Sequence, residues 1–91
     1  GERAEVIAEL EAELAAAEAE AELARLEVER GAGLLEGRVT SQSAYDRLVA
    51  ERDAAEGRAR AAKERLATAR AGSRAEDIAI ARARVASREV D

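Results

Sequence analysis

Three glycines lie close together in the segment Arg30-Gly-Ala-Gly-Leu-Leu-Glu-Gly-Arg-Val-Thr-Ser41, which interrupts a chain otherwise rich in helix-forming residues. Gly31 and Gly33 weaken the end of a helix, because glycine is a poor helix former. Gly37 is then the natural stop, in a left-handed conformation that needs no Cβ atom. The segment therefore predicts the bend of a helical hairpin.

The composition excludes an ordinary globular core. The 91 residues include one aromatic side chain and no Pro, Met, Cys, Trp or His. Leu, Ile and Val together make up only about a fifth of the chain, close to the composition of disordered proteins. However, Ala, Glu, Arg and Leu dominate, and these are the best helix formers. We therefore predict an all-α fold of thin helices that touch along alanine-rich seams.

Residues 3–30 contain neither Gly nor Pro, and their apolar residues recur at alternating steps of three and four. This spacing is typical of a coiled-coil seam. We predict a first helix over residues 3–36 and a tip over residues 37–40. The stripe consists of Ile7, Leu10, Leu14, Ala17, Ala21, Ala24 and Val28.

A second stripe with the same steps follows the bend and predicts a second helix over residues 41–71. Thr40, Ser41 and Ser43 can each accept a hydrogen bond from the first N–H groups of this helix. Ser43 with Asp46 makes a weak capping box, but Ser41 is the favoured cap. The stripe consists of Tyr45, Leu48, Arg52, Ala55, Ala59, Ala62, Leu66 and Ala69.

The two stripes also predict a register. If the hairpin turns near residues 36–37, the numbers of facing seam residues add to about 73. In this register the stem of Arg52 would cover Ala21, and its guanidinium would reach Glu18 or Glu22. We therefore predict a long antiparallel two-helix coiled-coil hairpin. The expected pairs are Ile7 with Leu66, Leu14 with Ala59, Ala21 with Arg52, and Val28 with Tyr45.

A short repeat supports the same axis. The segment Gly1-Glu-Arg-Ala-Glu-Val-Ile-Ala8 recurs as Gly72-Ser-Arg-Ala-Glu-Asp-Ile-Ala79. We expect Gly72 to break the helix, and Ser73 with Glu76 to form the capping box of a third helix over residues 74–90. The alternative is one unbroken helix through Gly72, at a cost of about 1 kcal/mol.

By this symmetry, residues 73–91 should pair with residues that would precede Gly1. We therefore interpret residues 1–91 as a coiled-coil hairpin fragment of a longer arm. We expect residues 73–91 to be either mobile or paired with another copy of the chain.

Charge is distributed unevenly between the two predicted helices. Residues 1–30 carry ten acidic and three basic side chains, whereas residues 38–91 carry nine acidic and twelve basic ones. Opposite charges would attract across an antiparallel pair, although two separately solvated helices are the alternative. The net charge of −5 argues against a nucleic-acid partner, because binding phosphates requires a basic face.

The sequence lacks the residues that ordinary catalysis requires. Without His or Cys there is no general base near neutrality, no thiolate and no soft metal ligand. We therefore expect no enzyme activity, no cofactor and no metal; a calcium site on Glu11, Glu13 or Glu18 is a minor alternative. The sequence also shows no signal peptide and no apolar run of about 18 residues.

Two motifs carry a resemblance to a known family. The spacing Arg30-x3-Leu34-x6-Ser41 and the Gly-x-Arg-x-Glu-x-Ile element at Gly1 and Gly72 resemble the helical hairpin of HlyD-family periplasmic adaptor (membrane fusion) proteins, in the YbhG-like branch. In that branch the hairpin is inserted between the halves of a lipoyl-like domain. Several copies stand side by side and meet a TolC-type outer-membrane channel tip to tip.

The resemblance implies roles for three tip residues. Arg30 would make polar contacts with the periplasmic end of the channel helices, and Leu34 would pack into the groove between them. Ser41 would hydrogen-bond at the contact or cap the second helix. Each residue also has a purely structural alternative: Arg30 neutralising a helix C-terminus, Leu34 or Leu35 closing the hairpin end, and Ser41 acting only as a cap.

The resemblance further implies a periplasmic location, with the full-length protein anchored to the inner membrane. Its partners would be the channel, further copies of the chain, and an ABC-type or proton-driven inner-membrane exporter reached through other domains. Two alternatives remain: a structural coiled-coil spacer whose tip binds nothing, and a nucleic-acid-binding arm, which the acidic first helix disfavours.

Overall fold

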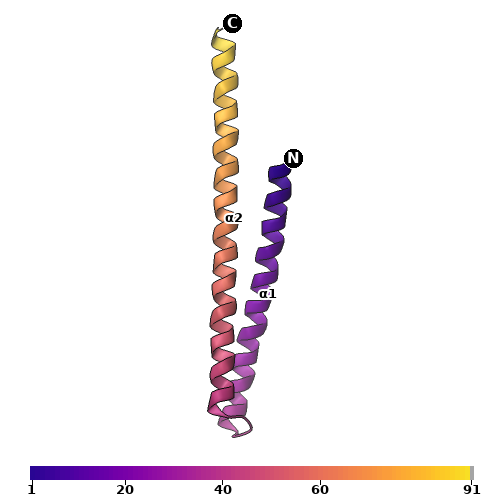
Figure 1. Ribbon diagram of the computed structural model, residues 1–91, viewed down its shortest axis with the longest axis vertical. Coiled ribbons are helices and arrows are strands. Elements are labelled where there is room, and N and C mark those ends of the chain that lie inside the picture. The colour runs from indigo at the N-terminus through magenta and orange to yellow at the C-terminus, as the bar shows by residue number, and fades with distance from the viewer. Residues whose placement is uncertain (91) are drawn as a thin grey trace.

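The computed structural model describes residues 1–90 and shows two long helices joined by a tight connection (Figure 1). Helix α1 spans Glu2–Glu36 and helix α2 spans Gln42–Val90. The molecule measures 80 × 16 × 14 Å, so it is a thin rod. The predicted all-α hairpin is confirmed.

The two helices bury the predicted seam. Every residue of both stripes is buried or half-buried, including Arg52. The most deeply buried ones are mainly alanines, whose small side chains allow two helices to approach closely. They are Ala21, Ala24 and Val28 from α1, and Ala55, Ala62 and Leu66 from α2. The core of this protein is therefore a narrow strip one side chain wide.

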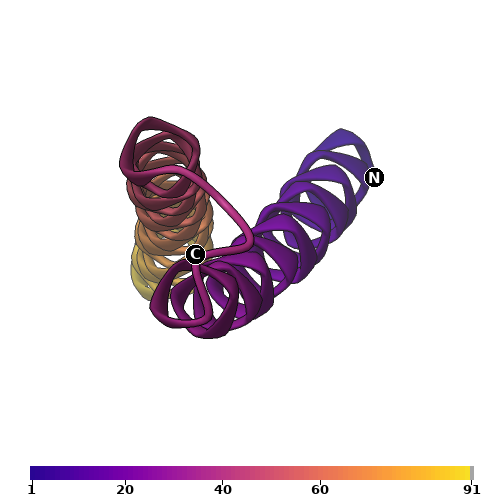
Figure 2. The ribbon, with the colours of Figure 1, turned by 90° about the horizontal axis from the view of Figure 1, so that it is seen from below.

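Packing is closest near the tip. Gly31 is buried, and a Cβ atom added to it would lie 2.6 Å from Cδ1 of Leu48 and 3.4 Å from Cδ1 of Tyr45. Only a glycine allows the helices to approach this closely without displacing Leu48. Figure 2, viewed from the tip, shows that α1 is inclined to α2, so the helices separate toward the N-terminus of α1.

The predicted register is wrong. Gly31 lies against Tyr45 and Leu48, whereas Val28 was expected to face Tyr45. Cross-helix ion pairs place Glu20 against Arg58 and Glu13 against Arg65, so their residue numbers add to 78 instead of about 73. The reason is the length of the connection. Helix α1 ends at Glu36 but α2 begins only at Gln42, so the turn is centred near residue 39.

Ion pairs connect the helices along most of α1. Arg65 and Arg58 of α2 lie 3.9 Å from Glu13 and Glu20, and Nη2 of Arg70 lies 3.4 Å from Oε2 of Glu11. Near the N-terminus of α1, Arg3 pairs with Glu76. The expected attraction between an acidic α1 and a basic α2 is therefore confirmed as a set of exposed pairs.

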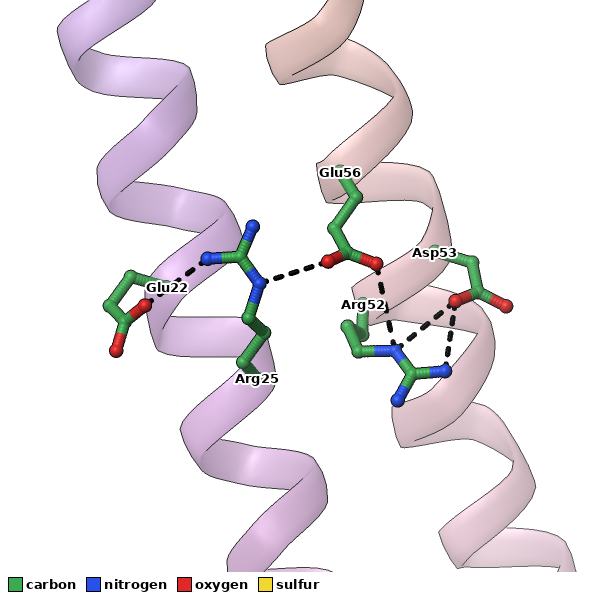
Figure 3. A network of polar contacts seen from close by, with 5 residues as sticks. All are labelled: Glu22, Arg25, Arg52, Asp53 and Glu56. Atoms are coloured by element: carbon green, nitrogen blue, oxygen red, sulfur yellow. Dashed lines mark hydrogen bonds and ion pairs between the residues drawn. The ribbon is translucent and has the colours of Figure 1, made fainter.

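One cross-helix pair belongs to a larger network (Figure 3). Nε of Arg25 donates a hydrogen bond of 2.9 Å to Oε2 of Glu56, and its Nη1 donates one of 3.1 Å to Glu22. These bonds raise the pKa of the Arg25 guanidinium, with Glu56 as the largest cause and Glu22 next. Glu56 also lies 3.8 Å from Nε of Arg52, so one carboxylate bridges an arginine from each helix.

The prediction for the guanidinium of Arg52 is wrong. It turns to its own helix and donates bonds of 3.1 and 3.0 Å to Oδ1 of Asp53, instead of reaching Glu18 or Glu22 (Figure 3). The register difference explains this result, because Arg52 now lies near Val28 and Glu22 is already bound to Arg25.

The predicted third helix is also wrong. Helix α2 continues without interruption through Gly57 and Gly72 to Val90, and none of the glycines in the described residues has a positive φ. Glycine lowers helix stability by only about 1 kcal/mol relative to alanine, and a 49-residue helix tolerates that penalty. Ser73 therefore caps nothing, and Glu76 pairs with Arg3 instead of closing a capping box.

The last turns of α2 extend beyond α1 (Figure 1). This part of the helix leaves Ile78, Ile80 and Val85 about half exposed. Asp91, which falls in the predicted C-terminal segment, lies outside the described residues. Within residues 1–90, neither helix has a stretch long and apolar enough to cross a membrane. Pairing of residues 73–91 with another copy stays a prediction.

A matched pair of glycine substitutions tests the close approach at the tip. Alanine gains about 1 kcal/mol in helix propensity at either Gly31 or Gly33. Nothing lies within 4 Å of a Cβ atom at Gly33, but a Cβ atom at Gly31 displaces Leu48. We expect Gly33→Ala to stabilise the hairpin and Gly31→Ala to be at least about 1 kcal/mol less stable than Gly33→Ala in urea unfolding followed by circular dichroism. Equal stabilisation by both would contradict the packing at Gly31.

Candidate functional site

The tip of the hairpin is built from backbone hydrogen bonds. The N–H of Arg38 donates to the carbonyl of Leu35 at 3.0 Å, and the N–H of Val39 donates to the carbonyl of Leu34 at 2.8 Å. These two bonds form a Schellman motif, which satisfies carbonyl groups left free at a helix C-terminus. The end of α1 therefore has a defined shape that does not depend on side-chain packing.

The left-handed residue at the tip is Arg38, with φ of 59°, and not Gly37 as predicted. Gly37 has φ of −78° and is the C-cap of α1, so the left-handed position falls one residue later than predicted. An L-residue in this conformation is strained, because its Cβ atom approaches the following carbonyl oxygen. The predicted end of the helix at Gly37 is confirmed, but the predicted left-handed conformation of Gly37 is wrong.

Ser41 caps helix α2, as predicted. Its Oγ accepts a hydrogen bond of 3.1 Å from the N–H of Ala44, and its carbonyl accepts the first helical bond from Tyr45. In the first turn of α2, Nε2 of Gln42 donates a hydrogen bond of 2.8 Å to Oδ1 of Asp46. Thr40 and Ser43 are therefore not the cap, and Ser41 has a structural role independent of any partner.

Arg30 lies near the end of α1 with its side chain 66% exposed. Its Nη1 donates a hydrogen bond of 3.0 Å to Oε1 of Glu27, one turn earlier on the same helix. An exposed pair of this kind contributes at most about 1 kcal/mol, so a partner's carboxylate or carbonyl can replace Glu27 at little cost. The guanidinium retains further donors for such an exchange.

Two apolar side chains stay exposed at the tip. Leu34, in the last turn of α1, is 40% exposed, whereas the neighbouring Leu35 is half-buried. Val39, in the connection, is 74% exposed. Leu34 thus keeps more exposed surface than Leu35, and Leu35 is the better placed of the two to close the hairpin end.

The structure brings the three predicted site residues to one end of the molecule. Arg30 and Leu34 lie in the last turns of α1, and Ser41 lies at the start of α2. Val39, which the sequence suggests only as a tip neighbour able to tune partner choice, lies between them in the connection. The sequence contains a signal for Val39, because a hydrophobic residue two positions after the C-cap often accompanies a Schellman motif.

Several acidic side chains of α1 pair with arginines of α2. Among residues 1–90, no three acidic side chains lie close enough together to hold a metal ion. Two of the three glutamates considered for calcium are paired with arginines: Glu11 with Arg70 and Glu13 with Arg65.

Substitution of Ser41 separates capping from binding. We expect Ser41→Ala to destabilise the hairpin by about 1 kcal/mol, because the N–H of Ala44 loses its acceptor. Ser41→Asp should keep most of the stability, since aspartate is an equally good N-cap. Urea unfolding of both variants measures this difference. A Ser41→Ala variant as stable as the wild type would exclude the cap as a stabilising contact.

Substitution of Arg38 tests the strained position. We expect Arg38→Gly to stabilise the hairpin by about 0.5–1 kcal/mol, because glycine adopts a positive φ without strain. Arg47→Gly provides the control: Arg47 lies within α2, where glycine should destabilise by a similar amount. Thermal unfolding followed by circular dichroism compares the two, and destabilisation by both would contradict the left-handed conformation.

Comparison with known proteins gives one match. A family model described as the YBHG alpha-helical hairpin domain matches residues 1–91. Neither the curated proteins nor the solved structures gave a match. The observed hairpin agrees with that description, and the match confirms the resemblance to the YbhG-like hairpin of adaptor proteins. The chain belongs to the YBHG alpha-helical hairpin family.

Proposed function

We propose that this hairpin is the arm of a periplasmic adaptor that docks by its tip to a TolC-type outer-membrane channel. Through other domains the adaptor would connect the channel to an ABC-type or proton-driven inner-membrane exporter. The proposal is supported above all by one observation: a full-length match to the hairpin family, on a chain whose Arg30 and Leu34 lie exposed at the hairpin end.

The shape suits a bridging role. The hairpin is 80 Å long but only 16 × 14 Å in cross-section, and its two helices support each other over most of that length. Such a rod can carry a binding tip far from the rest of a protein. We place the hairpin in the periplasm, with the full-length protein anchored to the inner membrane, as the family resemblance implies.

The chemistry of the tip suits the ends of partner helices. Arg30 offers a planar set of N–H donors for carboxylates and for the free carbonyls at helix C-termini. Leu34 adds apolar surface, which contributes about 1.5–3 kcal/mol when fully buried in a groove. Ser41 contributes by holding the start of α2 in place, and its hydroxyl is already engaged with Ala44.

A further apolar stripe, separate from the two stripes of the seam, supports side-by-side assembly of several copies. It follows steps of three, four and seven along α1, and its members are exposed. Another copy could pack on this stripe as α2 packs on the seam. Many weak tip contacts would then add up through multivalency. The stripe consists of Ala8, Ala12, Ala15, Ala19 and Leu26.

The same features support a role in binding and not in catalysis. The chain has no His and no Cys, and its acidic residues lie on the exposed surface of a thin rod. A structural spacer is the alternative function. It explains Ser41 as a cap, but it assigns no role to Arg30 and Leu34 at the glycine-rich bend.

Substitution of the tip in a complete adaptor tests the docking role. We expect Leu34→Ala and Arg30→Ala each to weaken binding to a purified TolC-type channel by about tenfold and to reduce export, because each removes a tip contact. The control is Leu23→Ala, which changes an exposed leucine on the same helix, away from the tip and outside the stripe proposed for assembly.

Helicity of each variant is checked by circular dichroism, and its oligomeric state by light scattering. Channel binding that survives both Leu34→Ala and Arg30→Ala would reduce the hairpin to a spacer. An equal loss with Leu23→Ala, in an otherwise intact assembly, would place the contact on the side of α1 instead of at its end.

A further inference from the structure

Val39 is the most exposed of the large hydrophobic side chains in the described residues. Its exposed fraction is 74%, against 40% for Leu34 and 59% for Leu23. An isolated exposed hydrophobic residue is common and needs no explanation by itself. The position of Val39, however, connects it directly to the proposed docking tip.

Backbone bonds hold Val39 in place. Its N–H donates to the carbonyl of Leu34 at 2.8 Å, so the two residues are joined across the end of α1. A Cβ atom added to Gly37 would lie 3.8 Å from Cγ2 of Val39, so this methyl group lies over the glycine. Val39 is therefore presented in a defined position and not on a freely moving loop.

The two residues also occupy the positions of the hydrophobic pair that often accompanies a Schellman motif. In that motif the residue two positions after the C-cap usually contacts the one at C3, which here are Val39 and Leu34. Both nevertheless keep much of their surface exposed. The hairpin end thus presents two exposed apolar side chains, one from the last turn of α1 and one from the connection.

The conformation that presents Val39 carries a strain. Arg38 adopts a positive φ immediately before it, a position where glycine would be free of strain. The Schellman motif needs this left-handed residue to bring the N–H of Val39 back onto Leu34. The strained residue therefore sets the direction in which Val39 leaves the helix end.

We infer that Val39 is a further docking residue, which buries its side chain together with Leu34 in the apolar groove between the helix ends of the channel. This inference rests on the proposed function and adds to it a contact from the connection between the helices. A partner that fits would offer an apolar groove wide enough for two side chains, with hydrogen-bond acceptors nearby for Arg30.

The test uses a near-isosteric substitution in the complete adaptor. Val39→Thr keeps the branched shape and backbone preference but replaces a methyl group with a hydroxyl. We expect binding to the purified TolC-type channel to weaken by about tenfold, whereas Val39→Leu, which keeps the apolar surface, should retain it. The control is Val85→Thr, the same change at a half-exposed valine far from the tip, which should leave binding unchanged.

The outcomes separate this inference from the proposed function. If Leu34→Ala weakens binding but Val39→Thr does not, Val39 is not a docking residue and the proposed function stands. If the wild-type adaptor binds the channel and neither substitution weakens that binding, tip docking itself is wrong. If the wild-type adaptor binds no TolC-type channel, both fail. Circular dichroism confirms that each variant is folded.

Discussion

The whole structure depends on close contact between two helices along a seam of small residues. Ala21, Ala24 and Ala55 form its centre, and Gly31 brings the backbones closest together near the tip. Because there is no second layer, every buried side chain lies in this one contact. Most seam residues lack the size to interlock firmly, so the seam favours pairing of the helices more strongly than it favours one particular alignment.

The alignment is therefore set elsewhere, by the tip and by charge. The connection has a fixed length, closed on one side by the Schellman motif after Leu34 and on the other by the Ser41 cap. Exposed ion pairs contribute little individually, but they favour one alignment over others because opposite charges must meet. Glu56, which contacts an arginine from each helix, is the best-connected of these groups (Figure 3).

The same construction explains how the tip can act as a binding site. Thin rods have no cleft, so recognition must rely on side chains that project from a rigid end. Here backbone hydrogen bonds provide the rigidity, which leaves Leu34 and Val39 free to stay exposed without loosening the fold. Ser41 differs from Leu34 and Val39, because its hydroxyl stabilises the fold by accepting a hydrogen bond at the start of α2.

Much of this protein could be predicted from its sequence. The heptad spacing identified the seam residues of both helices, because a buried stripe on a helix must recur every three or four positions. The helix end near Gly37, the Ser41 cap and the placement of Arg30 and Leu34 at the tip also follow from local chemistry. The tertiary structure decided the register, because alanine-rich seams fit several alignments and the length of the connection, together with the ion pairs, selects one. It also decided that Gly72 stays helical, since glycine permits either a continuous or a broken helix. It decided as well that Gly37 is the C-cap and that Arg38, not Gly37, adopts the left-handed conformation. The exposure of Val39 likewise depended on how the closed tip orients its side chains.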